Sequence, residues 1–167
     1  MALAVTGYTD SNWITKKGPI GYIRQHAGLL VPYYNPSTTL AFIAGEPIIY
    51  NGMVCVSSKL ILPSKMGEVY TNWLADFMLD PAHSGDILAN ATLWWSYDVD
   101  AITGNEGAVV ASAPTNGFIL GRAIAKPEDP VDGSNKKKVA VTGSVWVRVA
   151  SIQEPHTAIG TLPVTFN

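Results

Sequence analysis

Hydrophobic and polar positions alternate along several short stretches of this chain, and glycine, proline and asparagine separate these stretches. The clearest alternation covers residues 145–149, where three valines alternate with Trp146 and Arg148. A period of two is typical of a β-strand that buries one face. Strands are predicted over residues 47–50, 53–57, 60–63, 91–97, 109–111, 118–125, 139–141 and 145–149.

The strongest turn signal is Asn51-Gly52, between the apolar stretches 47–50 and 53–56. Both central residues of a type I′ turn need a positive φ, which asparagine and glycine adopt most easily. The chain from Pro47 to Val56 is therefore predicted to form a β-hairpin.

Residues 69–79 fit two periods at once. Trp73, Phe77 and Met78 share the spacing of a helix, whereas every second residue from Val69 to Leu79 is also apolar or β-branched. Enrichment in β-branched and aromatic residues favours a strand over a helix here.

Turn residues occur along the whole chain, with 15 Gly and 11 Pro among 167 residues. No long amphipathic helix is predicted, so the expected fold is mostly β, a small β-barrel or sandwich. We expect a β-rich domain over residues 38–150, an extended N-terminal arm over 1–37 and an extended C-terminal tail over 151–167.

The predicted arm is rich in aromatic residues, and such a segment is expected to lie on a partner's surface. A second aromatic feature is the pair Trp94-Trp95, whose side chains point to opposite faces if the segment is a strand. One of the two is expected in the core and the other on the outside, as a partner contact or as a sugar platform with Tyr97. The predicted partner-binding residues are Tyr8, Trp13, Tyr22, Tyr33, Tyr34, Trp94 and Trp95.

Composition narrows the function classes. The chain is 47% hydrophobic and 14% charged, with a formal net charge of -2. It can bury a core without disulfides, and it lacks the basic stripe of a nucleic-acid binder, since its only basic run is Lys136 to Lys138. Neither a signal peptide nor a membrane span is predicted, so we expect a soluble chain made in the cytoplasm.

The usual catalytic patterns are missing from the sequence. It contains no phosphate-binding loop and no dinucleotide fingerprint, and its three histidines lack zinc-site spacing. Cys55 lies in an apolar strand, where a thiol acts as a small hydrophobic group. No enzyme activity, cofactor or metal is predicted, although Asp98 and Asp100 are read either as turn caps or as a cation site.

The order of the segments resembles a family of small bacteriophage capsid decoration proteins, also called cement proteins. The similar segments follow one another in residues 43–56, 67–69, 73–79, 85–88, 92–95, 116–123 and 145–149. Residues 75–77, Ala-Asp-Phe, depart from the Gly-x-Phe pattern of the family's strand. The arm, the loop from Lys126 to Lys138 and the C-terminal tail extend beyond the family's compact core.

The resemblance implies a structural virion protein on the outside of an icosahedral head, where it clamps major capsid subunits. It also implies a homotrimer, made in the host cytoplasm, that binds the major capsid protein. The charge and composition above predict neither a nucleic-acid nor a membrane partner. The alternative is a β-sandwich carbohydrate-binding module that uses exposed Trp and Tyr side chains.

Overall fold

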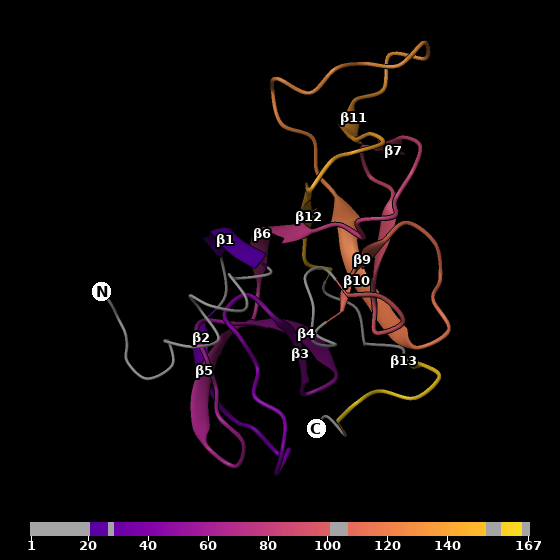
Figure 1. Ribbon diagram of the computed structural model, residues 1–167. Helices are drawn as coiled ribbons and strands as arrows, with labels where there is room; N and C mark the ends of the chain where they lie inside the picture. The colour runs from indigo at the N-terminus through magenta and orange to yellow at the C-terminus, as the bar shows by residue number, and fades with distance from the viewer. Residues whose placement is uncertain (1–20, 27–28, 101–106, 153–157, 165–167) are drawn as a thin grey trace, which may run out of the picture.

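The computed structural model describes residues 21–26, 29–100, 107–152 and 158–164, and within them every regular element is a β-strand (Figure 1). The strands are β1 (Gly21–His26), β2 (Leu30–Tyr34), β3 (Pro47–Tyr50), β4 (Met53–Ser57), β5 (Met66–Tyr70), β6 (Trp73–Met78), β7 (Ile87–Leu88), β8 (Thr92–Ser96), β9 (Ala108–Val110), β10 (Gly117–Ala123), β11 (Lys138–Ala140), β12 (Trp146–Ala150) and β13 (Ala158–Ile159). The predicted mostly-β class is confirmed. In the part of the chain that is described, no helix is long and apolar enough to cross a membrane.

The strands form a small sheet, a large sheet and one separate pair. The small sheet has the order β2-β5-β4-β3, and the large sheet has the order β1-β6-β12-β10-β8-β9, with β13 also paired to β10. β7 and β11 pair on their own beyond one end of the large sheet (Figure 1). All these ladders are antiparallel. Successive side chains along each pleated strand point to opposite faces of its sheet.

The large sheet curls but does not close into a barrel. An isolated parallel bridge joins Leu79, just after β6, to Val109 in β9, and the Asp80 N–H donates to the Val109 carbonyl at 2.9 Å. One bridge is not a ladder, so the fold is sandwich-like rather than a barrel.

Both local predictions with a specific turn or period are confirmed. Asn51 and Gly52 have φ values of 52° and 76°, and Tyr50 lies opposite Met53, as a type I′ hairpin requires. The segment 69–79 is extended rather than helical, although a turn at residues 71–72 separates β5 from β6.

The main core lies between the two sheets. β6 contributes Trp73 and Phe77, and β4 of the small sheet contributes Val54 and Val56. The Trp73 indole N–H donates to the Val54 carbonyl at 3.1 Å, so a buried hydrogen bond joins the two sheets. A second core lies on the opposite face of the small sheet and contains Tyr33, Phe42, Ile48, Cys55, Ile61, Val69 and Val164.

The extended arm predicted over residues 1–37 is wrong for residues 21–26 and 30–34. β1 pairs with β6 and β2 pairs with β5, so this part of the chain belongs to both sheets. The strands escaped the sequence analysis for two reasons. β1 carries a bulge at Arg24 that interrupts its period, and β2 is apolar on both faces.

The ends of the chain also differ from the predicted boundaries. In the segment predicted as a tail, β13 pairs with β10, and Val164 is 9% exposed in the second core. Residues 1–20, the rest of the predicted arm, lie outside the described residues.

Candidate functional site

The described residues contain no cluster of three or more His, Cys, Asp or Glu side chains that could hold a metal ion. Asp98 instead caps a turn, because its Oδ2 accepts the Thr115 N–H at 2.7 Å and the Asn116 N–H at 3.1 Å. Hydrogen bonds from the Asn116 amide and from these N–H groups lower the pKa of Asp98. The turn-cap interpretation of Asp98 therefore describes this carboxylate.

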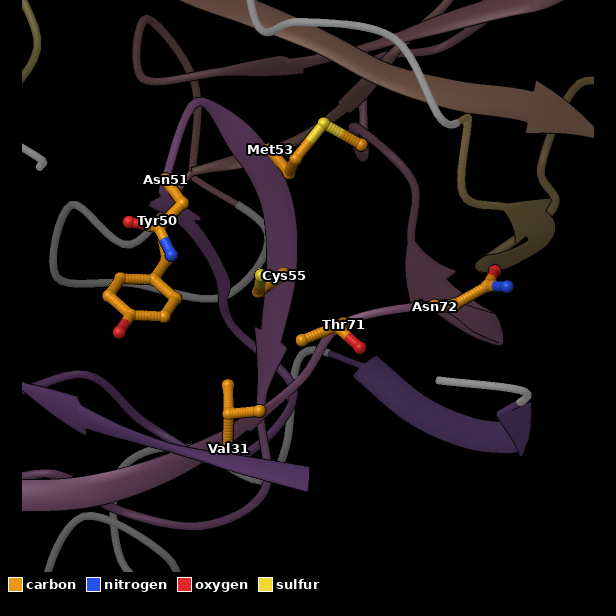
Figure 2. Close-up of a pocket in the computed structure, with 7 residues that line it drawn as sticks. All are labelled: Val31, Tyr50, Asn51, Met53, Cys55, Thr71 and Asn72. Carbon is orange, nitrogen blue, oxygen red and sulfur yellow. The ribbon is translucent and has the colours of Figure 1, made fainter. Parts of the chain in front are cut away.

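A pocket of ≈ 350 Å³ lies where the β3–β4 hairpin and the β2–β5 pair of the small sheet diverge (Figure 2). β4 and β5 pair only at Val56 and Ser57, and the space opens beyond that point. The lining residues are Val31, Tyr50, Asn51, Met53, Cys55, Thr71 and Asn72. The lining combines apolar side chains with a few amide and hydroxyl groups.

Cys55 lies at this pocket but is 1% exposed, as its apolar sequence context predicts. Burial raises the pKa of its thiol to about 11. A nucleophilic cysteine needs the opposite shift, because only the thiolate attacks. Cys55 is therefore a core residue.

We expect Cys55 to resist modification in the native protein. At pH 8 a disulfide reagent such as DTNB should titrate no thiol before denaturant is added and one thiol afterwards. Rapid reaction of the native chain, at the rate of a free cysteine, would contradict the buried position.

A charged cluster crosses three strands on the outer face of the large sheet. Asp76 on β6 is 7% exposed, and its carboxylate contacts Arg24 Nε at 2.7 Å and Arg148 Nε at 2.8 Å. Arg24 is the bulged residue of β1, so the bulge aims its guanidinium at Asp76. Both oxygens of the Asp76 carboxylate accept from arginines, and the nearby Asp80 carboxylate accepts the Ala82 N–H instead.

The Asp76 cluster should make stability depend on acid pH. Burial alone would raise the pKa of Asp76, but the hydrogen bonds and charges of Arg148 and Arg24 outweigh burial and lower it. A lowered folded-state pKa stabilises the protein above the unfolded value of about 4, and this contribution is lost as pH falls through the folded value. Asp76→Asn should lower the free energy of unfolding by about 2 kcal/mol at pH 7. The same variant should lose less stability than the wild type as the pH falls towards 2.

Chemical denaturation between pH 2 and pH 7 measures this effect. Asp86→Asn is the control, because Asp86 pairs with Lys138 at a more exposed position. If the free energy of unfolding falls as steeply with decreasing pH in Asp76→Asn as in the wild type, the cluster does not set the pH dependence.

The predicted partner-binding residues have different positions in the structure. Tyr33 and Trp95 are 1% and 0% exposed, so these two side chains belong to the cores and not to a contact surface. Tyr34 is 50% exposed, and Trp94 is half-buried on the outer face of the large sheet, as expected for one of two adjacent tryptophans. Tyr8, Trp13 and the side chain of Tyr22 lie outside what the structure describes.

An apolar surface continues from Tyr34 across β2 and β5. In register, Leu30 lies opposite Tyr70, Pro32 opposite Glu68 and Tyr34 opposite Met66. Tyr70 also pairs with Val56 and packs against the main core, so these residues share the sheet face that β3 and β4 bury against the large sheet. We call the exposed part of it, Leu30, Pro32, Tyr34, Met66 and Glu68, the β2–β5 face.

The β2–β5 face is unusual for a solvated antiparallel sheet, which normally alternates apolar and polar residues. Leu30, Tyr34 and Met66 are 40%, 50% and 62% exposed. Leu30, Pro32 and Met66 were not among the predicted partner-binding residues. The available signal was β2 itself, Leu-Val-Pro-Tyr-Tyr, which carries no polar residue for a solvent-facing side.

Comparisons with protein-family models, curated proteins and solved structures found no match to this chain.

Proposed function

We propose that the protein is a structural virion protein that binds the outside of an icosahedral phage head and stabilises contacts between major capsid subunits. The observation that carries the proposal is the β2–β5 face, an apolar surface on a protein whose described part has two well-formed cores. Exposed apolar surface of this kind marks sites of protein contact. The serial resemblance to decoration proteins supplies the identity of the partner.

A homotrimer on a symmetric lattice would add many weak contacts through multivalency. The proposed location is the capsid exterior, after synthesis in the host cytoplasm.

A carbohydrate-binding module is the second candidate function, and the observation that favours it is the position of Trp94. Trp94 lies on the outer face of β8 opposite Ile119 and Val110. Trp95 is buried and the Tyr97 hydroxyl is enclosed, whereas Trp94 is half-buried on the outer face. This support is weaker than that of the β2–β5 face.

Co-sedimentation with expanded heads of the phage that encodes this chain tests the proposal. We expect the chain to sediment with the heads and to raise the temperature at which the heads disrupt. We expect it not to bind sugar resins. Light scattering of the free chain tests the homotrimer. A chain that neither binds heads nor raises their thermal stability would contradict the proposed function, and retention on a sugar resin with a change in tryptophan fluorescence would favour the second candidate.

A further inference from the structure

The edge of β2 is closed to strand addition by Pro32. The Asn35 N–H donates to the Lys65 carbonyl at 2.9 Å, and the Thr71 N–H donates to the Leu29 carbonyl at 3.2 Å. Hydrogen-bonded pairs alternate along an antiparallel ladder, so Val31 and Tyr33 also bond to β5. The backbone groups of Leu30, Pro32 and Tyr34 therefore face the free edge of β2, the side on which no described strand pairs with it.

Proline has no N–H, so the middle position of this free edge lacks its donor. A strand added beside β2 would leave one of its own carbonyls without a partner opposite Pro32. Edge strands are commonly protected from unwanted pairing in this way. The side chains of the β2–β5 face, rather than the backbone of β2, remain for contact.

Glu68 lies in the centre of the β2–β5 face. It is opposite Pro32, with Met66 and Tyr70 two residues away on the same face of β5. Its side chain is exposed, and no described side chain forms an ion pair with it. A carboxylate surrounded by apolar groups favours a partner that brings a cation, because burying an unpaired charge is costly.

The central position of Glu68 also argues against a second copy on this face. Two copies related by a two-fold axis through the Pro32–Glu68 pair would bring their Glu68 carboxylates together. Like charges opposed across an interface disfavour that pairing.

We propose that the β2–β5 face receives an apolar protein surface carrying one lysine or arginine opposite Glu68, through side-chain contact and not through strand addition. The inference rests on the proposed function, in which that surface belongs to the major capsid subunit. It adds which face of this protein makes the contact and what charge the partner must present.

The first measurement tests whether the β2–β5 face is exposed to solvent in the free protein. Met66 oxidation by hydrogen peroxide, followed by mass spectrometry on the full chain, should proceed at the rate of an exposed methionine at all protein concentrations. Met53, half-buried at the pocket, should react more slowly. Protection of Met66 that grows with concentration would assign the face to a second copy, and constant protection would assign it to the chain's own N-terminal segment. Either result would overturn the proposal.

The second measurement compares variants in head co-sedimentation. Glu68→Lys should weaken binding about 100-fold, and the double variant Tyr34→Ser with Met66→Ser should weaken it at least about 30-fold. The matched controls are Glu128→Lys, an exposed glutamate on the distant loop, and Leu40→Ser with Leu62→Ser, which are 41% and 48% exposed. Both controls should bind within about 3-fold of the wild type.

Pro32→Val tests the mode of contact, because it restores the missing N–H at the edge. Head binding within about 3-fold of the wild type supports contact through the side chains of the β2–β5 face. Binding tightened by about 10-fold or more indicates strand addition and overturns the proposed mode of contact. If wild-type chain binds heads and the face variants bind equally well, the inference fails and the proposed function stands. If the wild-type chain does not bind heads, both fail.

Discussion

Tyr33→Ala should lower the free energy of unfolding by about 3–5 kcal/mol, whereas Tyr34→Ala should change it by less than about 1 kcal/mol. The two tyrosines are adjacent in sequence but lie on opposite faces of β2. Tyr33 is 1% exposed and contacts the rings of Phe42 and Tyr50 edge-on, with centroids 6.1 Å and 5.5 Å away. Tyr34 is 50% exposed.

Tyr33→Phe separates the ring from the hydroxyl. The Tyr33 hydroxyl is buried, and no group of the described residues forms a hydrogen bond with it. Removing an unpaired buried hydroxyl should leave stability unchanged or raise it slightly, because the ring contacts remain. Urea denaturation of the three variants measures these differences. Equal, small losses for Tyr33→Ala and Tyr34→Ala would show that residues 30–34 behave as an arm after all.

Gly45→Ala should lower the free energy of unfolding by about 3–4 kcal/mol, because two separate costs add. Gly45 has a φ of 81°, in the left-handed region that disfavours side chains. A Cβ there would lie 2.1 Å from the Gly21 carbonyl oxygen, which is backbone at the start of β1. The strand or the turn would have to move.

Gly85→Ala is the matched control for this prediction. Gly85 has a φ of 91°, and a Cβ there would meet no atom within 4 Å. Gly85→Ala should lower the free energy of unfolding by about 1–2 kcal/mol, and this loss measures the cost of the backbone conformation alone. Thermal and urea denaturation compare the two variants. Similar losses in both would mean that β1 does not approach Gly45 as closely as the structure has it.

Local patterns predicted much of the fold. The Asn51-Gly52 hairpin, the extended segment from Val69 and the strand at residues 145–149 depend on turn chemistry and on a period of two, which neighbouring residues determine. The helix-like spacing of Trp73, Phe77 and Met78 has a simple origin in β6. Trp73 and Phe77 face the main core, whereas Met78 lies half-buried on the outer face, so apolar residues occur on both sides of the strand.

The sequence could not place residues 21–34, because their strands depend on distant partners. β1 needs β6 some fifty residues away, and its bulge breaks the alternation that would have revealed it. β2 carries apolar residues on both faces, a pattern that predicts burial but does not say against what. The adjacent residues Tyr33 and Tyr34 look equivalent in sequence, and only the face that each takes in the sheet separates core from surface.

The sequence by itself therefore determined that this is a β-rich chain, with its main hairpin in register and with one of Trp94 and Trp95 inside. The resemblance of its segment order to capsid decoration proteins stays a prediction. The tertiary structure alone decided that Leu30, Tyr34, Met66 and Glu68 form one surface, since residues on β2 and β5 meet only through strand pairing. It also decided that Pro32 closes the β2 edge, because the direction of a backbone N–H depends on which pairs of the ladder are bonded.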